Sequence, residues 1–272
     1  MPRSIRPLRV NHINAVVDGF DASVSHLQKL YDAEFLVDLP QREWRACLVE
    51  IGRVIIELFV PHAFLLNSRY GPHYLGVEYQ ADMDEVREAL AARDIRIVRD
   101  IGPALHTHPA DCFGVSFEFF GGSFHEREWP SLGGQMRSAG YWRDEHALGL
   151  TGLKAYTVAV TDIDDASAFF QDLLSAEVTY EAARPGVAAR AIGLQVADAM
   201  VEIVTPIHDG ALRQHLTQFG QGIRSIVFGT CDIKQVQRYF AERGVDALPG
   251  AAPNTLAVPA SDNLGLIFEF SE

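Results

Sequence analysis

Two histidines and two glutamates occupy matched positions in the first half of the chain and could together bind a metal ion. The interval from His12 to Glu57 equals the interval from His73 to Glu118. Imidazole nitrogens and carboxylate oxygens are ligands for borderline and hard divalent cations. A single histidine in a strand is usually structural, but two at matched positions, each with a matched glutamate, favour a metal site. The sequence therefore predicts one divalent ion, Zn, Mn, Co, Ni or Fe, bound by all four side chains.

Glu118 ends a stretch that recurs at the end of the chain. His108-Pro-Ala-Asp-Cys-Phe-Gly-Val-Ser-Phe-Glu118 is matched by Pro259-Ala-Ser-Asp-Asn-Leu-Gly-Leu-Ile-Phe-Glu269. In both copies proline and glycine mark a turn, and the apolar residues that follow favour a strand. A carboxylate that faces the interior from such a strand needs a proton, a partner or a metal ion, because an isolated buried charge is costly.

These residues fall in a unit of one strand, one helix and three further strands, βαβββ, that occurs four times. In the first copy, alternating apolar and polar residues predict a strand over 8–17. Helical spacing predicts a helix over 21–32 with Asp21 as its N-cap, and three short strands follow. Further copies begin near residues 73, 153 and 223. A repeat of this kind indicates the architecture before any single motif does.

The four copies predict an α+β protein of two tandem modules, each made of paired βαβββ units. The metal-binding module covers residues 1–122, a linker covers 123–150, and a second module covers 151–272. Glycines, charges and aromatic residues break the repeat in the linker. Packing is the expected role of its aromatic side chains, with a cover over the site as the alternative; they are Trp129, Tyr141 and Trp142.

The second module lacks both histidines of the predicted site. In an alignment of the two halves, His12 corresponds to Tyr156 and His73 to Arg224. The glutamates are retained in this half, as Glu202 and Glu269. We therefore predict a degenerate second module that binds no metal, in which Arg224 forms an ion pair with Glu269.

Other polar residues near the predicted site have two interpretations each. His106 and His108 precede the last strand of the first module, and we interpret them as surface histidines of a turn, with an acid–base role as the alternative. Three further residues face the interior or the solvent according to the phase of their strands: Asn14, Tyr74 and Glu78.

Composition excludes several classes of protein. The chain has 272 residues, of which 48% are hydrophobic, so it can bury one large core or two medium ones. A net charge of -13 argues against nucleic acid as a partner. Three scattered cysteines do not form a disulfide framework, and no long apolar run indicates a membrane segment. We expect a soluble, cytoplasmic protein whose partner is a small molecule.

The candidate ligands and the repeat resemble the vicinal-oxygen-chelate superfamily, which includes glyoxalase I, methylmalonyl-CoA epimerase, extradiol dioxygenases and the fosfomycin and bleomycin resistance proteins. The resemblance covers nearly the whole chain. It implies that each module is a U-shaped eight-stranded sheet around a cleft, where a metal leaves sites open for two substrate oxygens. The positions where glyoxalase I has His or Gln, Glu, His and Glu are matched by His12, Glu57, His73 and Glu118. The stretch from His108 to Glu118 is most similar to the epimerase. In this superfamily, two modules can form a cleft within one chain or between two chains. The resemblance therefore also allows a homodimer.

The resemblance implies proton-transfer chemistry, an isomerisation, epimerisation or lyase reaction, on a small substrate that chelates the metal through neighbouring oxygens. The metal stabilises the negative charge that forms when a carbon loses its proton. Glu118 or Glu57 is the candidate catalytic base, and either could instead be a permanent ligand. The second base of the epimerases, a glutamate on the third strand, has no counterpart among residues 45–48.

Two alternative functions stay open. An Fe(II)-dependent extradiol-type dioxygenase would bind its iron through two imidazoles and one carboxylate, those of His12, His73 and Glu118. Against it, the tyrosine and Asp-Pro-x-Gly turn usual before the last ligand of those enzymes are replaced here by residues 106–114. A ligand-sequestering protein of the bleomycin-resistance kind is the second alternative, and it predicts no metal.

Overall fold

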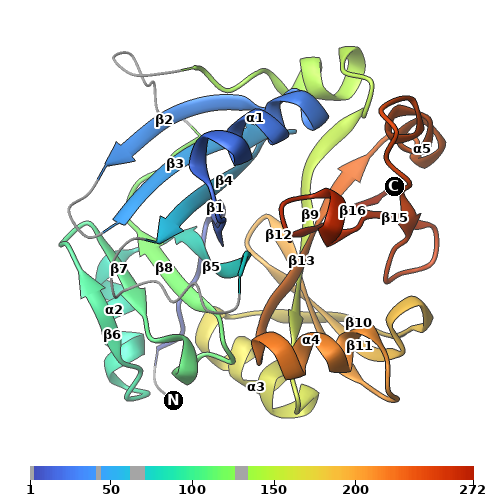
Figure 1. Cartoon of the computed structure of the whole chain (residues 1–272). Helices are drawn as coiled ribbons and strands as arrows, with labels where there is room; N and C mark the ends of the chain where they lie inside the picture. The colour runs from blue at the N-terminus through green and yellow to red at the C-terminus, as the bar shows by residue number, and fades with distance from the viewer. Residues whose placement is uncertain (1–2, 41–43, 62–70, 126–133) are drawn as a thin grey trace. The chain divides into compact units, whose positions relative to one another are not determined.

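The first eight strands form one mixed sheet in the computed structural model (Figure 1). The structure describes residues 3–40, 44–61, 71–125 and 134–272. The strand order is β2-β3-β4-β1-β5-β8-β7-β6. The strands are β1 Arg9–Val16, β2 Glu34–Pro40, β3 Trp44–Ile51, β4 Val54–Pro61, β5 His73–Gln80, β6 Ile97–Asp100, β7 Ala104–Thr107 and β8 Ser116–Phe120.

The last eight strands repeat this arrangement in a second mixed sheet. Its order, β10-β11-β12-β9-β13-β16-β15-β14, is the order of the first sheet with each number raised by eight. The strands are β9 Leu150–Ala159, β10 Glu177–Arg184, β11 Ala189–Val196, β12 Ala199–Pro206, β13 Gly222–Thr230, β14 Leu248–Pro249, β15 Thr255–Val258 and β16 Ile267–Ser271. The predicted fold class, two tandem modules of paired βαβββ units, is confirmed.

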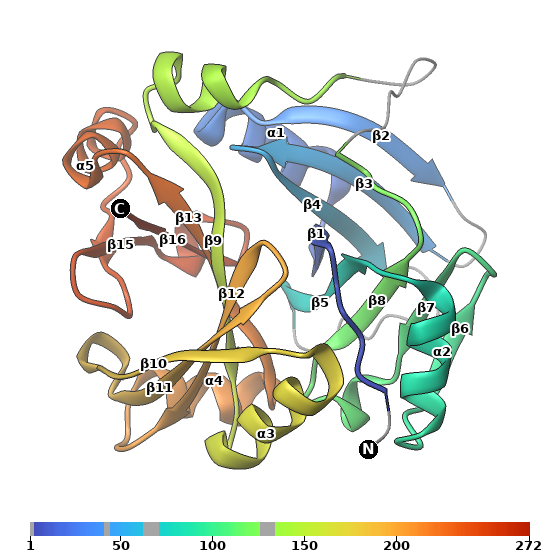
Figure 2. The same cartoon turned by 180° about the vertical axis from the view of Figure 1, so that it is seen from behind.

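Each opening strand of a βαβββ unit leads into a helix. These helices are α1 Phe20–Tyr31, α2 Met83–Ala91, α3 Ile163–Leu174 and α5 Ile233–Glu242. Figure 2 shows α3 beside β11 and β12, which it contacts. Within the described ranges, no helix combines the length and the hydropathy needed to span a membrane.

Aspartate side chains begin three of these helices. Asp82, Asp162 and Asp232 each accept hydrogen bonds from two backbone N–H groups of the first turn, which otherwise lack partners. The prediction that Asp21 caps α1 is wrong, because Gly19 holds the N-cap position. Asp21 lies in the first turn instead, where a negative charge favours the helix dipole.

One helix, α4 at Ala211–Phe219, was not predicted, although Leu212, Leu216 and Phe219 recur at helical spacing. The segment lies outside the repeated βαβββ unit, from which the other helices were predicted. The helix lies between β12 and β13. Its equivalent in the first half would fall in residues 62–70, which lie outside the described ranges.

Parallel pairing inside each unit decides which residues become neighbours. The opening and closing strands pair in parallel, β1 with β4, β5 with β8, β9 with β12 and β13 with β16. Residues far apart in the sequence therefore lie side by side, as Asn14 and Glu57 do in one pair and Glu78 and Glu118 do in another. Paired residues project to the same face of the sheet.

The chain forms two compact units that do not follow the two sheets. Unit 1 consists of Met1–His12, Leu75–Glu126 and Ala155–Arg224, and unit 2 consists of Ile13–Tyr74, Arg127–Lys154 and Ser225–Glu272. Each unit thus combines residues from both halves of the sequence. The module boundaries of 1–122, 123–150 and 151–272 stay a prediction.

Unit 1 is held together by buried contacts between the two halves. The hydroxyl groups of Tyr79 and Tyr156 lie 2.6 Å apart in a fully buried position. The backbone N–H of Ile5 donates to the carbonyl of Leu173 at 2.8 Å. Phe117 packs edge-on against Phe170, with ring centroids 5.6 Å apart. These contacts bury aromatic surface, which provides much of the driving force for folding.

Unit 2 has comparable contacts of its own. Tyr31 donates to Asn263 Oδ1 at 2.7 Å, and Tyr239 donates to the carbonyl of Leu30 at 3.0 Å. Trp142, from the predicted linker, is fully buried in this unit. Packing is therefore the observed role of Trp142, whereas Trp129 lies outside the described residues.

Candidate metal centre

One histidine and two glutamates of unit 1 converge on a common point. They are His12 on β1, Glu78 on β5 and Glu118 on β8, and all three are buried. One ligand atom from each lies within 4.8 Å of the others. In the part of the chain that the structure describes, this is the one group of three or more His, Cys, Asp or Glu residues with such spacing.

Strand pairing builds this group. Glu78 and Glu118 are direct partners in the parallel pair of β5 with β8, so both carboxylates leave the same face. Gly76 faces Ser116 two residues earlier, and the strands approach so closely that a Cβ at Gly76 would lie 1.9 Å from the Ser116 carbonyl oxygen. From β1, the Nε2 atom of His12 reaches to 3.4 Å from Oε2 of Glu78.

Two further polar residues hold the carboxylates. Asn11 Nδ2 donates to Oε1 of Glu78 at 2.9 Å. His106, the β7 partner of Glu118, brings its Nε2 atom to 3.0 Å from Oε1 of that carboxylate. Each glutamate therefore has at least one oxygen fixed by a side chain of unit 1.

The two glutamates have opposite electrostatic behaviour. Burial raises the pKa of Glu78, an effect that His12 opposes and the negative charge of Glu118 reinforces. Burial also acts to raise the pKa of Glu118, but the nearby His106 and His12 and a hydrogen bond from Glu78 together lower it to about 2. Glu78 therefore tends to keep its proton, and Glu118 stays ionised beside it.

The donor set fits a divalent metal ion. Two buried carboxylates close together repel each other when both are ionised, so they need a shared proton or a cation. A raised pKa at Glu78 beside a lowered pKa at Glu118 is the pattern expected when two such carboxylates share one proton. One imidazole and two carboxylates are a suitable set for Mn, Fe, Co, Ni or Zn, and a bound ion would replace that proton.

The group contains two of the four ligands predicted from the sequence. His12 and Glu118 belong to it, whereas Glu57 and His73 do not. His73 is an odd number of residues from Glu78 on the same strand, and alternation points such residues to opposite faces. Its Nδ1 atom lies 2.8 Å from the Gly71 carbonyl oxygen. Metal binding by Glu57 and His73 stays a prediction.

The sequence did not predict that Glu78 and His106 lie beside Glu118. From the sequence, the Glu78 side chain could face either the interior or the solvent. Only the pairing of β5 with β8 shows that it lies on the same face as Glu118. His106 was interpreted as a turn residue, but it lies in β7 opposite Glu118. Both residues become neighbours of Glu118 only through the strand order, which the sequence does not show.

The second sheet carries different residues at the position of His12. Asn14 and Thr157 are the strand partners of the aligned glutamates on β4 and β12. Two residues before them lie His12 and Ala155. The alignment of His12 with Tyr156 is therefore wrong by one residue, and the counterpart of the imidazole is a methyl group.

The other positions of the group also differ in the second sheet. The strand partners of Glu269 are Val227 and Ala257, whereas Glu118 has a glutamate and a histidine in the same places. Glu269 accepts hydrogen bonds from Oγ of Ser225 at 2.9 Å and from a backbone N–H at 2.8 Å. Only one carboxylate of the group is thus retained.

Glu202, the counterpart of Glu57, is neutralised by a buried arginine. Nε of Arg184 donates to both carboxylate oxygens, at 3.0 and 2.9 Å, and Tyr180 donates to Oε2 at 2.5 Å. The predicted pair between Arg224 and Glu269 stays a prediction.

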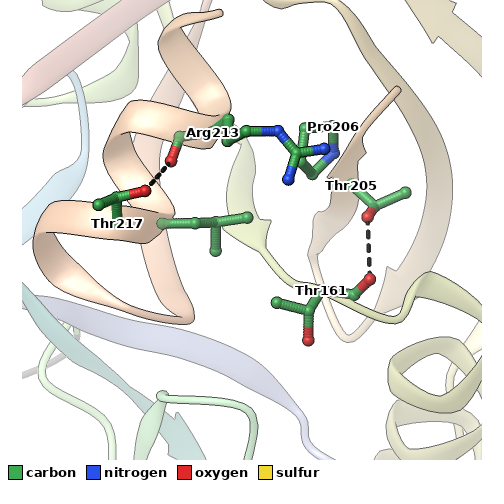
Figure 3. Close-up of a pocket in the computed structure, with 6 residues that line it drawn as sticks. Thr161, Thr205, Pro206, Arg213 and Thr217 are labelled. Atoms are coloured by element: carbon green, nitrogen blue, oxygen red, sulfur yellow. Dashed lines mark hydrogen bonds between the residues drawn. The ribbon is translucent and has the colours of Figure 1, made fainter. Parts of the chain in front are cut away.

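Unit 1 also has a pocket of about 300 Å³ beside α4, at the ends of β9 and β12 (Figure 3). Thr205 donates to the carbonyl of Thr161 at 3.3 Å, and Thr217 donates to that of Arg213 at 2.9 Å. The lining offers hydroxyl groups and one guanidinium, but no carboxylate or imidazole. Its residues are Thr161, Thr205, Pro206, Arg213, Leu216 and Thr217. The pocket therefore lacks the groups that acid–base or metal chemistry requires.

Comparison with known proteins identifies the fold. No protein-family model matches the sequence, and no curated protein matches it. A mutant of 4-hydroxymandelate synthase from Streptomyces coelicolor matches 97% of this chain and 92% of its own, with 12% identity and a TM-score of 0.73. Methylmalonyl-CoA epimerase from Mycobacterium tuberculosis matches 44% of this chain and 87% of its own, at 23% identity and a TM-score of 0.42. A Streptomyces coelicolor methylmalonyl-CoA epimerase in complex with 2-nitronate-propionyl-CoA matches 44% and 96%, at 22% identity and 0.42.

Proposed function

Because the chain has the tandem fold of the vicinal-oxygen-chelate superfamily, we propose that it is a metal-dependent enzyme that transfers a proton on a small substrate. The substrate carries neighbouring oxygen atoms, and the reaction is an isomerisation, an epimerisation or a lyase reaction. The ion is divalent and is held in unit 1 by His12, Glu78 and Glu118.

The observation that supports this proposal is the convergence of those three buried side chains within 4.8 Å. Buried ionisable residues in such an arrangement destabilise a protein unless they are paired, and they occur often at functional sites. When bound, a divalent ion supplies a Lewis acid that stabilises negative charge on the substrate oxygens.

Glu118 is the first candidate for the base that removes the substrate proton. Its carboxylate lies 3.0 Å from the Nε2 atom of His106, which can pass on a proton that the carboxylate removes from the substrate. The His106 side chain is 18% exposed, which gives this proton a route toward solvent. Glu57, the other candidate base, is buried on β4 and stays an alternative.

Elemental analysis and calorimetric titration with Mn²⁺, Co²⁺ and Zn²⁺ test the ligand set. We expect the wild-type protein to bind about one equivalent of metal. Glu78→Gln and His12→Ala should abolish binding or weaken it strongly, because each removes a ligand. Glu57→Gln and His73→Ala are the matched controls, and they should retain the metal.

The opposite pattern would reject this ligand set. Metal lost from His73→Ala but kept by Glu78→Gln would favour the four residues predicted from the sequence. A wild-type protein that binds none of these ions would reject the metal-dependent function and favour ligand sequestration.

The reaction class has a separate test. Metal-loaded protein in D₂O is incubated with hydroxycarbonyl compounds and acyl thioesters, and proton NMR follows exchange at the carbon beside the oxygens. Exchange that Glu118→Gln abolishes would support proton transfer. Oxygen uptake by the iron-loaded protein with a catechol, without exchange on any substrate, would instead indicate the dioxygenase alternative.

A further inference from the structure

The carboxylates of the metal group are held by two residues that are not themselves members of the group. Asn11 is fully buried and donates to Glu78, and His106 contacts Glu118 from the neighbouring strand. In a protein interior, a buried polar side chain keeps a fixed orientation when its donors and acceptors are used.

Asn11 uses both ends of its carboxamide. Its Nδ2 atom donates to Oε1 of Glu78 at 2.9 Å and to the Gly122 carbonyl at 3.1 Å. Its Oδ1 atom accepts from the backbone N–H of Phe124 at 3.2 Å. The orientation of the amide follows from this network, since the reversed amide would place a donor against the Phe124 N–H.

These hydrogen bonds connect Glu78 to the segment 121–125, which follows β8. The Phe124 ring in this segment meets the His12 ring edge-on, with centroids 5.2 Å apart and planes at 87°. Two of the three ligands therefore contact this segment, one through Asn11 and one through an aromatic ring.

His106 is fixed by the pairing of β7 with β8. The next residue, Thr107, connects β7 to β8 through its side chain. Its Oγ1 accepts a hydrogen bond from the N–H of Phe117 at 2.9 Å and donates one to the Phe117 carbonyl at 3.3 Å. His106 thus faces Glu118 from a fully bonded strand. Its ring nitrogens do not belong to the metal group, so its contact is with the ligand rather than with the ion.

We propose that Asn11 and His106 are positioning residues of the metal centre, and that Asn11 couples the centre to the segment 121–125. This inference rests on the proposed metal-dependent function. Each residue holds one carboxylate oxygen in place, which reduces the orientational freedom that the ligand must lose when an ion binds. Removing either residue should weaken metal binding without removing a ligand atom.

Titration with Co²⁺ measures this effect through calorimetry and through the visible absorption of the bound ion. We expect Asn11→Leu and His106→Leu to lower the affinity about 10- to 100-fold. His106→Gln, which keeps a donor near Glu118, should restore most of the affinity. His208→Leu, a change of an exposed histidine in the same unit, is the control and should bind as the wild type does.

Asn11→Ala covers the case in which Asn11→Leu fails to fold. This variant removes the donor to Glu78 without adding bulk or charge to the buried site. We expect it to fold and to bind Co²⁺ with a similarly lowered affinity.

Hydrogen exchange tests the coupling to the segment 121–125. In the wild type, Co²⁺ or Zn²⁺ should slow exchange of the Phe124 amide, because the ion fixes Glu78 and through it Asn11. In Asn11→Leu, saturating metal should slow that exchange much less, because only the contact between the His12 and Phe124 rings remains. If Asn11 has a purely structural role, Asn11→Leu should change the exchange rate of the Phe124 amide by the same factor with and without metal.

The outcomes separate this inference from the proposed function. If the wild type binds no ion, the proposed function fails, and the inference fails with it. If the wild type binds an ion while Asn11→Leu or Asn11→Ala and His106→Leu match its affinity and spectrum, the inference is wrong and the metal-dependent function stands.

Discussion

At the scale of single residues, the phase of a strand decides which side chains can share a metal ion. His73 and Glu78 are five residues apart on the same strand, and the group that contains Glu78 does not include His73. Gly76 lies between them, and its missing side chain lets β5 approach β8. The positions of Glu78 and Glu118 in the group therefore depend on the close approach of the two strands at Gly76.

Gly76→Ala should weaken both the fold and the metal centre. A Cβ here would lie 1.9 Å from the Ser116 carbonyl oxygen, so the two strands would have to separate. We expect a loss of about 1–3 kcal/mol in the free energy of unfolding, measured by urea denaturation. Gly140→Ala is the control, since its Cβ would approach no atom closer than 3.8 Å. Equal stability of the two variants would contradict the close approach.

At the scale of elements, a buried histidine, His146, connects the segment 134–150 to helix α1 within unit 2. His146 Nε2 lies 3.0 Å from Oδ2 of Asp32, at the end of α1, and its Nδ1 accepts from the Leu148 N–H at 3.2 Å. Burial lowers the pKa of His146, and Arg243 and Arg137 add to this effect, while Asp32 opposes it. The folded protein therefore favours the neutral ring.

The stability of the protein should accordingly depend on the protonation of His146. Because its pKa is lower in the folded state, this contribution is complete above the unfolded value of 6.5 and is lost as the pH falls below it. Thermal unfolding between about pH 8 and about pH 5 should show a smaller loss of stability for His146→Gln than for the wild type. His208→Gln is the control for an exposed histidine. An identical pH dependence in all three proteins would contradict this role.

At the scale of the whole molecule, each compact unit is built from both halves of the sequence. In unit 1, Tyr79 from the first half meets Tyr156 from the second, and in unit 2, Tyr31 meets Asn263. A cut between the halves would therefore remove buried partners from both units at once.

Separate expression of residues 1–149 and 150–272, divided before β9 so that Trp142 and His146 are retained, tests this dependence. We expect neither fragment alone to show a cooperative thermal transition, because each would expose apolar surface that the other half buries. Mixing the two should restore a cooperative transition and a one-to-one complex, measured by circular dichroism and light scattering. A fragment that unfolds cooperatively by itself would support the independent modules predicted from the sequence.

Local sequence patterns were sufficient to predict the repeated elements of the fold. Alternation, helical spacing and turn residues were sufficient for the four βαβββ units, and the repeat was sufficient for two equivalent sheets. His12 and Glu118 were also identified from matched positions. The start of α1 was missed because its N-cap is a glycine without a capping side chain. Helix α4 was missed although its apolar residues have helical spacing, because it lies outside the repeated unit.

The tertiary structure alone decided which distant residues meet. Glu78 joins the group instead of His73 because β5 pairs with β8 in a register that no local pattern encodes. His106 and Asn11 gain their contacts in the same way, from a neighbouring strand and from the segment after β8. The compact units likewise follow from packing between segments far apart in the chain, since a sequence records the period of each strand but not its neighbours.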